Sequence, residues 1–459
     1  MSEQSNSQPT LNDIVSLCKR RGFVFPSSEI YGGFAASWDY GPLGVELKNN
    51  VKRLWWQDTV TDNENVVGMD GAVTTHPRVW EASGHVEGFH DPMVDCKTCG
   101  HRFRADKLEE ERCPKKPSKF VCECDGELTE PRDFNLMFKL HWGPIEDPKN
   151  ITYLRPETCQ TIFINFKNVV TVTRQRVPFG IAQMGKSFRN EITTKSFIFR
   201  QREFEQMEME FFVHPTEGDK WFEFWLDRRR NWYESLGVRK DNLRMRQHEG
   251  DELAHYAKDC YDVEYKFPMG WQELEGIANR GDFDLKRHME YSKKDLSYRD
   301  DATGEKYVPW VIESSAGVDR TILVLLSDAY DLDKAPNDKG VMEERLVLRF
   351  SPKVAPVNLA VFPLMKKPPL IEMARKIEAD LRGPYRTMYD ETGNIGKRYR
   401  RQDEIGTPLC VTVDFDSLED NTVTIRNRDS MGQIRVSVDQ LHQAVADQMK
   451  TMEKPWDQK

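Results

Sequence analysis

A highly charged stretch at 186–208, KSFRNEITTKSFIFRQREFEQME, constrains the fold more than any other part of this chain. Its two halves predict short strands, 187–192 and 197–208, joined by a polar turn at 193–195. Such a hairpin does not fit a plain hydrophobic core, because each unpaired buried charge is strongly unfavourable. Two interpretations remain open. The hairpin lines a polar cleft in which arginines bind phosphate and an aromatic ring stacks on a base, or it is a solvated, salt-bridged hairpin.

Composition indicates a water-soluble protein of two or three domains. The chain has 459 residues, of which 31% are charged and 38% hydrophobic. It contains no apolar run of the length that a membrane span needs, and its first residues lack a basic region followed by an apolar one. We therefore expect no membrane partner, a cytoplasmic location and a disordered tail at 1–9. The net charge of −9 argues against indiscriminate nucleic-acid binding but allows a local basic patch.

The nine cysteines indicate reduced thiols or metal ligands rather than disulfides. Cys96 and Cys99 form one pair, and Cys122 and Cys124 form a second about 25 residues later. This spacing is typical of a zinc ribbon, in which four thiolates surround one Zn²⁺. The second pair departs from the usual Cys-x-x-Cys, and Cys113 offers an alternative ligand. A set of reduced thiols without metal is the other interpretation.

A second anchor lies at 309–326, PWVIESSAGVDRTILVLL. The pattern predicts a strand that ends at Glu313, a turn over 314–317, and an apolar helix opened by Asp319 and Arg320. An arginine at a helix N-terminus opposes the helix dipole, but it is tolerated where an anion binds. The segment therefore predicts an anion site.

The remaining pattern gives the domain order. We expect helices at 10–21, 46–59, 159–169 and 216–237, with Pro156 and Glu157 in the first turn of the third. A glycine- and aromatic-rich loop is expected at 23–44, then a strand closed by Pro77, and a strand at 261–267. Beyond it, Glu273 and Glu275 alternate onto one face of an extended segment.

From 351 onward a proline-rich linker leads into alternating strands and helices, which predict an α/β domain with a mixed sheet. Its basic helix carries Lys397, Arg398, Arg400 and Arg401, and these form either an RNA contact or a solvated face.

These motifs, in this order, resemble those of the class II aminoacyl-tRNA synthetases. Phe188-Arg189-x-Glu191, followed by Arg200, Phe204 and Glu208, is similar to their motif 2. The segment at 309–326 is similar to motif 3, although only Gly317 of its three glycines is present. The helix and strand before Pro77 resemble motif 1 more weakly. The stretches LRPET, KSFRNEI, FEQMEMEFF, LEGIANRGDFDL and VIESSAGVDR resemble the dimeric glycyl-tRNA synthetase family in particular.

The resemblance implies an α+β fold, the class II antiparallel sheet flanked by helices. It divides the chain into a catalytic domain at 10–350 and an anticodon-binding α/β domain at 351–459. Within the catalytic domain it implies a cysteine-rich insertion at 90–131, with zinc ligands Cys96, Cys99, Cys122 and Cys124. A further insertion is expected at 216–300, between motifs 2 and 3.

The implied activity is ATP-dependent formation of glycyl-adenylate, with release of pyrophosphate, followed by transfer of the glycyl group to the 3′ end of tRNA(Gly). The implied partners are glycine, ATP, Mg²⁺, tRNA(Gly) and a second copy of the chain. By resemblance, Arg189 and Arg320 are catalytic: Arg189 neutralises the α-phosphate and Arg320 reaches the γ-phosphate. Phe204 stacks on adenine, and Glu273 is a candidate for holding Mg²⁺. The residues expected around ATP are Arg189, Asn190, Glu191, Phe199, Arg200, Gln201, Arg202, Glu203, Phe204, Glu273, Leu274, Gly317, Val318, Asp319 and Arg320.

Glycine offers no side chain to bind, and one methyl group in an apolar pocket changes binding by only about 1–3 kcal/mol. Selectivity must therefore come from acidic walls pressed close to the α-carbon and the ammonium group. The residues that the resemblance places around glycine are Arg104, Glu157, Phe204, Glu205, Gln206, Met207, Glu208, Glu313, Ser314, Ser315, Ala316 and Gly317. Two other functions stay open: a class II synthetase for another amino acid, and a non-catalytic synthetase-like protein that binds RNA or a polymerase.

Overall fold

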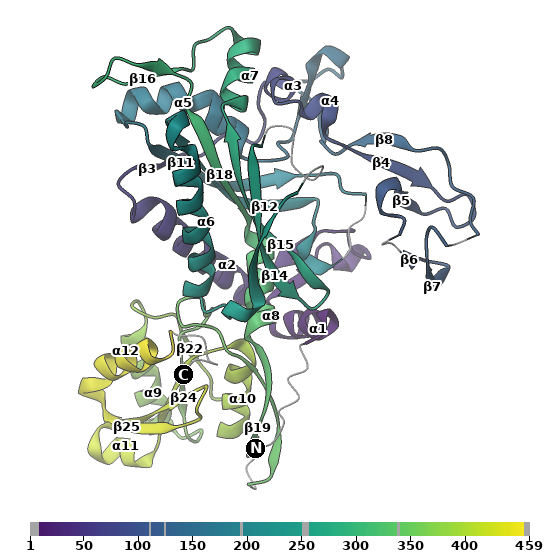
Figure 1. Ribbon diagram of the computed structural model, residues 1–459. Helices are drawn as coiled ribbons and strands as arrows, with labels where there is room; N and C mark the ends of the chain where they lie inside the picture. The colour runs from purple at the N-terminus through teal and green to yellow at the C-terminus, as the bar shows by residue number, and fades with distance from the viewer. Residues whose placement is uncertain are drawn as a thin grey trace.

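The computed structural model describes residues 9–109, 112–123, 125–192, 196–249, 257–336 and 340–453. Within these ranges a large N-terminal part surrounds one broad sheet, a smaller C-terminal domain lies at one end of it, and a cysteine-rich arm extends to the side (Figure 1). In the same ranges, no helix is both long and apolar enough to cross a membrane. Residues 1–8 of the predicted tail and the predicted turn at 193–195 lie outside the described residues.

Seven of the described strands form the broad sheet, in the order β13-β14-β15-β18-β12-β11-β3. Neighbouring strands are antiparallel except β11 and β3, which are parallel. This confirms the predicted α+β class. The strands are β3 (Val66–Gly68), β11 (Phe179–Phe188), β12 (Glu203–Val213), β13 (Leu243–Gln247), β14 (Asp259–Phe267), β15 (Gly270–Gly281) and β18 (Trp310–Gly317).

Alternation along the strands divides the sheet into two faces, because successive side chains point in opposite directions. On β12, Met207, Met209 and Phe211 join the core formed with helices α2, α6 and α8, whereas Phe212 joins the core formed with α5 and α7. The second face also carries polar side chains, and they line the cleft described below. The helices are α2 (Pro42–Trp56), α5 (Cys159–Thr173), α6 (Gly218–Ser235), α7 (Phe283–Ser292) and α8 (Val318–Ala329).

The N-terminal segment begins with α1 (Leu11–Arg21), where Thr10 and Asp13 form a reciprocal capping box. The predicted loop at 23–44 instead contains two short paired strands, β1 (Val24–Pro26) and β2 (Trp38–Tyr40). This stretch packs closely against its surroundings at Gly44. A Cβ atom at this glycine would lie 1.9 Å from the carbonyl oxygen of Phe23.

Shorter elements complete the N-terminal part. The arm contains β4 (His90–Asp95), β5 (Arg102–Arg104), β6 (Arg112–Cys113), β7 (Lys116–Phe120) and β8 (Arg132–Asn135). The other elements are α3 (Pro77–Ala82), α4 (His85–Gly88), β9 (Lys139–His141), β10 (Ile151–Tyr153), β16 (Tyr298–Arg299), β17 (Lys306–Tyr307), β19 (Tyr330–Pro336) and β20 (Met342–Leu348).

The C-terminal domain has its own core and a mixed sheet in the order β22-β21-β23-β24-β25. The first three strands are parallel, and β24 and β25 are antiparallel, which confirms the predicted mixed sheet. Its elements are β21 (Leu359–Pro363), α9 (Pro368–Leu381), β22 (Thr387–Tyr389), α10 (Ile395–Ile405), β23 (Leu409–Val413), α11 (Phe415–Asp420), β24 (Thr422–Asn427), β25 (Gln433–Ser437) and α12 (Leu441–Thr451).

The structure corrects several predicted boundaries. The hairpin strands are β11 and β12, so the described residues of the charged segment between them, 189–192 and 196–202, are not strand. Strand β18 continues through the predicted turn at 314–317 and ends only at Gly317. Pro77 opens α3 instead of closing a strand, because its fixed φ and missing N–H suit the first turn of a helix. Glu157 was expected in the first turn of α5, but that helix begins only at Cys159, so Glu157 precedes it.

Three further expectations also change. The stretch 216–300 supplies α6, three strands of the broad sheet and α7, so it is part of the central architecture. The predicted linker after 351 is packed against the main core, where Val354 and Ala355 are buried. Glu273 and Glu275 do not share a face, because the pairing of β14 with β15 shifts register between them.

Candidate active site

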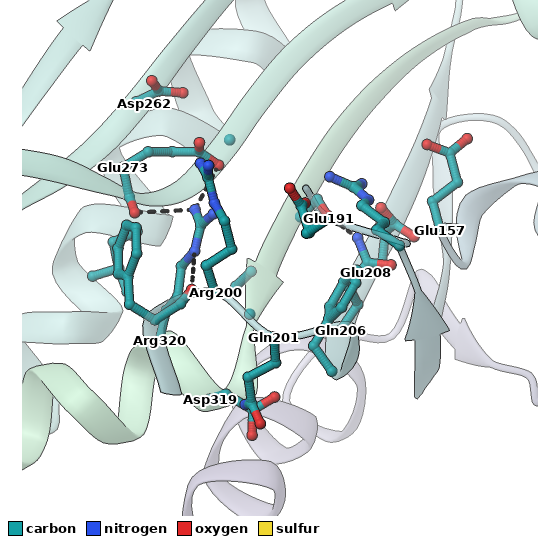
Figure 2. A pocket seen from close by; sticks show the side chains of 18 of the residues that line it. Glu157, Glu191, Arg200, Gln201, Gln206, Glu208, Asp262, Glu273, Asp319 and Arg320 are labelled. Atoms are coloured by element: carbon teal, nitrogen blue, oxygen red, sulfur yellow. Dashed lines mark hydrogen bonds and ion pairs between the residues drawn. The ribbon is translucent and has the colours of Figure 1, made fainter. Parts of the chain in front are cut away.

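A cleft of about 490 Å³ lies on the open face of the broad sheet. Figure 2 shows Glu273 and Arg320 at one side of this cleft and Glu157 and Glu208 at the other. The lining residues come from β12, β15 and β18, from the segments next to them and from the arm. They are Phe89, Asp91, Arg104, Leu136, Glu157, Arg189, Glu191, Ile198, Phe199, Arg200, Gln201, Phe204, Gln206, Glu208, His248, Ala257, Cys260, Asp262, Glu273, Leu274, Gly276, Ala278, Glu313, Ser315, Ala316, Gly317, Asp319 and Arg320.

The first side of the cleft is cationic and aromatic. The Arg189 guanidinium lies 5.4 Å from the centre of the Phe204 ring, and its Nε donates to the carbonyl oxygen of Pro156 at 3.0 Å. The Arg320 guanidinium lies 4.6 Å from the centre of the Phe199 ring and forms an ion pair with Glu273 at 3.0 Å. Arg320 holds the pKa of Glu273 below its ordinary value, so this carboxylate is ionised. Rings and guanidinium groups of this kind bind a base and its phosphates.

The second side is acidic and buried. Glu157 accepts hydrogen bonds from Cys159 Sγ and Gln160 Nε2, each at 3.0 Å, and lies 3.3 Å from His85 Nε2. Burial favours the neutral carboxyl, but His85 and Arg280 outweigh burial and hold the pKa of Glu157 well below its ordinary value. Glu157 is therefore a carboxylate positioned to receive a cation.

Glu208 and Glu313 complete the acidic side. Glu208 accepts a hydrogen bond from the Thr158 backbone N–H at 3.0 Å, and burial followed by the charge of Glu157 raises its pKa. Glu313 forms an ion pair with Arg280 at 2.7 Å. Burial nevertheless raises the pKa of Glu313 to about 7. This group therefore changes charge near neutral pH, and a bound ammonium group would favour its ionised form.

A fourth carboxyl, Glu210, lies behind this side. Ligand atoms of Cys159, Glu208, Glu210 and Glu313 all lie within 4.8 Å of one another, and all four residues are buried. Neither carboxylate oxygen of Glu210 has a hydrogen-bond partner. Burial and then Glu313 raise the pKa of Glu210 well above its ordinary value, which favours the neutral form of this carboxyl.

The structure gathers most of the predicted site residues into this one cleft. Those expected around ATP that line it are Arg189, Glu191, Phe199, Arg200, Gln201, Phe204, Glu273, Leu274, Gly317, Asp319 and Arg320. Those expected around glycine that line it are Arg104, Glu157, Phe204, Gln206, Glu208, Glu313, Ser315, Ala316 and Gly317.

The other predicted residues are near the cleft but do not line it. Glu205 forms an ion pair with Lys48 at 2.8 Å, and its backbone N–H donates to Asp319 at 3.1 Å, so it joins β12 to α2 and α8. Met207 and Val318 belong to the main core, and Ser314 lies on the opposite face of β18 from Ser315. Asn190, Arg202 and Glu203 stand beside the cleft at the ends of the hairpin strands.

Sequence reasoning missed several residues that shape the acidic side. Arg280, His85 and Thr158 contact Glu313, Glu157 and Glu208 respectively. Arg280 and Thr158 lie inside the stretches LEGIANRGDFDL and LRPET, which had drawn attention only to their acidic residues. His85 comes from α4, a short helix that carried no sequence signal.

The predicted zinc ligands are only partly placed. Cys96 and Cys99 lie together in the arm, with buried Cys113 near enough for its charge to act on both thiols. Cys122 is exposed, and Cys124 lies outside the described residues. Across the ranges that the structure describes, no three thiols of the arm have all their sulfur atoms within 4.8 Å of one another.

In α10, the basic helix of the C-terminal domain, three of the four basic side chains contact other groups of the protein. Arg398 is buried and donates to the carbonyl oxygens of Glu391 and Gly393, at 3.1 and 2.6 Å. Arg401 forms an ion pair with Asp390 at 2.5 Å, and Arg400 donates to a backbone carbonyl at 3.3 Å. Lys397 is exposed. Both predicted alternatives, an RNA contact and a solvated face, are therefore wrong for Arg398.

Comparison with known proteins agrees with this architecture. Residues 138–329 match the family described as tRNA synthetase class II core domain (G, H, P, S and T), and residues 358–448 match an anticodon binding domain. With its antiparallel sheet and its Arg189–Phe204 and Arg320 motifs, the chain belongs to the class II aminoacyl-tRNA synthetases.

Its relatives specify the family within that class. The glycine–tRNA ligase of Treponema denticola is 57% identical over 444 residues, covering 96% of this chain and 97% of that protein. The glycine–tRNA ligase of Bifidobacterium longum is 55% identical and covers 96% of this chain and 93% of that protein. That of Thermobifida fusca is 53% identical and covers 98% and 99%. The chain belongs to the glycine–tRNA ligase family.

Proposed function

We propose that this protein activates glycine with ATP and transfers it to tRNA(Gly). The observation that carries the proposal is the division of one cleft into a cationic, aromatic side and an acidic side. ATP presents an aromatic base and a polyanion, and glycine presents an ammonium group. The cleft is able to bind both at once, with the carboxylate of glycine directed towards the α-phosphate.

The nucleotide side positions the first step. Adenine stacks on Phe204, and Arg189 contacts the α-phosphate from the same side of the cleft, because its guanidinium already lies 5.4 Å from that ring. A glycine carboxylate oxygen attacks the α-phosphorus, the bond to the bridging oxygen breaks, and pyrophosphate leaves. Catalysis of this kind depends on position and on charge neutralisation at the phosphate, so no protein nucleophile is needed.

Arg320 binds the γ-phosphate in this proposal. In the structure its guanidinium is held by Glu273 and by the carbonyl oxygen of Phe199 at 3.4 Å. Glu273 also fits Mg²⁺, which proteins bind through one or two carboxylates together with phosphate oxygens of the substrate. When bound, the ion would neutralise phosphate charge.

The acidic side selects glycine. Glu157 and Glu313 bind the ammonium group, while Glu208 and Ser315 close the space around the α-carbon. Glu208 and Ser315 are directly paired across β12 and β18, so the backbone fixes their separation. A larger amino acid would have to displace buried, hydrogen-bonded carboxyls, and this exclusion discriminates more strongly than the loss of one apolar contact.

For the second step, the terminal ribose hydroxyl of tRNA attacks the carbonyl carbon of glycyl-adenylate, and AMP leaves. The C-terminal domain binds the anticodon, in keeping with the family that its residues 358–448 match. Arg104, which reaches the cleft from the arm and pairs with Asp91 at 3.0 Å, is placed to contact the substrate end.

We further propose that the arm binds Zn²⁺ through Cys96, Cys99, Cys122 and Cys124, with Cys113 as the alternative fourth ligand. Zinc would stabilise an arm whose own hydrophobic cluster is small. We also propose a cytoplasmic homodimer. The apolar side chains of Ile30, Tyr31 and Phe34 are 88%, 86% and 66% exposed, and such patches favour a protein interface.

Exchange of labelled pyrophosphate into ATP tests the proposed activity. The assay is run with each of the twenty amino acids, with and without tRNA and Zn²⁺. Exchange with glycine alone is expected. Exchange with another amino acid would move the assignment within class II, and no exchange under any condition would support the non-catalytic alternative.

A further inference from the structure

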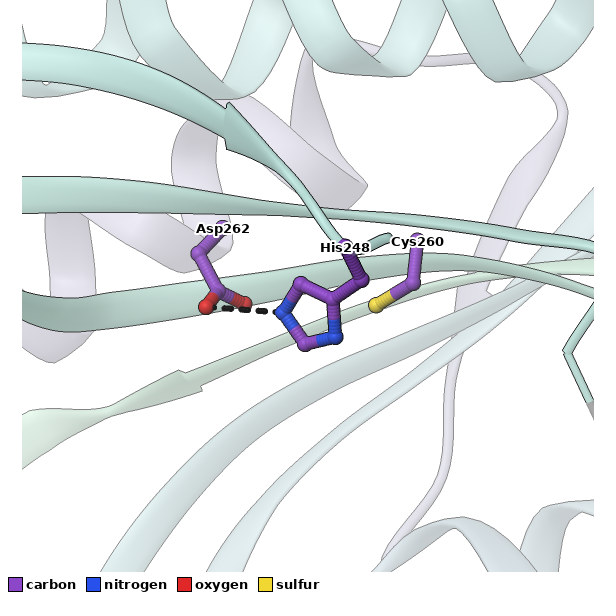
Figure 3. Close-up of side chains that lie close together, drawn as sticks. All are labelled: His248, Cys260 and Asp262. Atoms are coloured by element: carbon purple, nitrogen blue, oxygen red, sulfur yellow. Dashed lines mark ion pairs between the residues drawn. The ribbon is translucent and has the colours of Figure 1, made fainter. Parts of the chain in front are cut away.

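Three metal-ligating side chains meet at the wall of the cleft, away from the acidic side. His248, Cys260 and Asp262 each offer one ligand atom, and these atoms all lie within 4.8 Å of one another. His248 Nε2 is 2.9 Å from Asp262 Oδ2. Figure 3 shows the His248 ring between the Asp262 carboxylate and the Cys260 sulfur.

The sheet fixes this group firmly. Cys260 and Asp262 alternate on β14, so both side chains point to the same face, and the His248 backbone N–H donates to the Cys260 carbonyl oxygen at 2.9 Å. All three residues line the cleft. Asp262 is directly paired with Gly276, which pairs with Ser315, so the group lies two strands from the proposed glycine pocket on the same face.

We propose that His248, Cys260 and Asp262 form a second metal site, which takes a thiophilic divalent cation of the Zn²⁺ class and keeps one coordination position open to the cleft. Nitrogen, sulfur and carboxylate oxygen are the ligands that Zn²⁺ prefers. Three protein ligands with a fourth position free are typical of sites that receive water or a substrate atom, whereas structural sites use four protein ligands.

Two features favour a metal over other uses of the same residues. A nucleophilic Cys–His–Asp set requires the thiol to contact the imidazole that acts as its base, whereas the interaction that the His248 ring makes within this group is with Asp262, at 2.9 Å. Mg²⁺ is disfavoured, because it prefers oxygen ligands. A bound Zn²⁺-class ion would displace the thiol proton to solvent and neutralise the Asp262 carboxylate.

The geometry needs only a small adjustment. Zn²⁺ with bonds of about 2.0–2.3 Å separates tetrahedral ligands by roughly 3.3–3.7 Å. The present separation of 2.9 Å between His248 and Asp262 is shorter, so the ion would part them by side-chain rotation. Arg246 Nη2 lies 3.3 Å from Asp262 Oδ2, and such a rotation would break this ion pair.

Cobalt titration of the metal-stripped, untagged full-length chain tests this site, because Co²⁺ replaces Zn²⁺ and gives a thiolate-to-cobalt absorption band. The paired variants are Cys260→Ser, which removes the sulfur ligand, and Cys410→Ala, which removes a buried thiol of the C-terminal domain. We expect Cys260→Ser to lose one equivalent of bound Co²⁺ and part of the thiolate band, and Cys410→Ala to lose neither. An unchanged band in Cys260→Ser overturns the proposal.

The arm must be separated from this site. In a Cys96→Ser/Cys99→Ser background the proposed arm site is removed, and one equivalent of Co²⁺ with the band of a single thiolate should remain; no remaining thiolate band overturns the proposal. His248→Gln in the wild-type background provides a second check, because it should lose the same equivalent as Cys260→Ser while keeping every cysteine. Addition of ATP should shift the remaining cobalt bands, and bands that ATP leaves unmoved overturn the open position.

Discussion

Glu313 makes glycine binding depend on pH, and this dependence can be predicted from the structure. Burial raises the pKa of its carboxyl to about 7, from an ordinary value of 4.5. Below pH 7 the group is mostly protonated and offers no negative charge to the ammonium group of glycine. Affinity for glycine therefore falls as the pH falls from 8 to 6, a range in which an ordinary carboxylate would stay ionised and leave the affinity unchanged.

The expected magnitude follows from one titrating group. At pH 6 about nine-tenths of a carboxyl with this pKa is protonated, and at pH 8 about one-tenth, so the apparent affinity for glycine should differ by about 10-fold. Glu313→Gln removes the titration and should give a pH-independent affinity. At pH 8 the variant also loses a charge-assisted hydrogen bond worth about 1.5–3 kcal/mol, or roughly 10- to 150-fold in affinity.

Calorimetric titration with glycine, in the presence of a non-hydrolysable ATP analogue, measures this between pH 6 and pH 8. Glu305→Gln is the matched control, because Glu305 is 57% exposed and lies outside the cleft. It should keep the wild-type slope. Equal wild-type affinities at pH 6 and pH 8, or the same slope in Glu313→Gln, would refute the reasoning.

Three further predictions concern stability. Glu210→Gln keeps the shape of the side chain but cannot ionise. Because the pKa of Glu210 is raised in the folded state, the wild-type protein loses stability as the pH rises above the pKa of this group in the unfolded chain. The variant should therefore match the wild-type free energy of unfolding near pH 4 and exceed it at pH 8 in denaturant titrations. Arg229→Leu leaves the fully buried Glu275 carboxylate without its partner at 2.6 Å and should cost about 3–5 kcal/mol in the same titrations, whereas an unchanged unfolding midpoint contradicts it. Gly44→Ala places a Cβ atom 1.9 Å from the Phe23 carbonyl oxygen and should lower the melting temperature measured by calorimetry. Gly88→Ala, where the added atom meets nothing within 4 Å, is the milder control.

The sequence predicted which residues gather in the cleft better than it predicted the elements that carry them. Arg189, Phe204 and Arg320 could be singled out by their resemblance to motifs 2 and 3, because charge and aromatic content alone left a cleft and a solvated hairpin equally open. The strands themselves were misplaced, because tertiary pairing extends β11 and β18 beyond what local patterning shows. A hydrophobic pattern locates a buried face, but it does not locate the end of a hydrogen-bonded ladder.

The separation of Glu273 from Glu275 shows a second limit. Strict alternation places both on one face, yet a register shift between β14 and β15 sends Glu275 to Arg229 of α6 and leaves Glu273 with Arg320 in the cleft. A bulge depends on the pairing of two strands, so neither strand predicts it alone. The support that His85 and Arg280 give to the acidic side was equally hidden, because each reaches its partner from a distant element.

A structure of the complex with a stable glycyl-adenylate analogue, such as glycyl-sulfamoyl-adenosine, tests the two-sided cleft most directly. The account predicts adenine on Phe204, Arg189 at the sulfamoyl group that replaces the α-phosphate, and the ammonium group within hydrogen-bonding distance of Glu157 and Glu313. An analogue bound in the reverse direction, or an ammonium group away from both carboxyls, would contradict it.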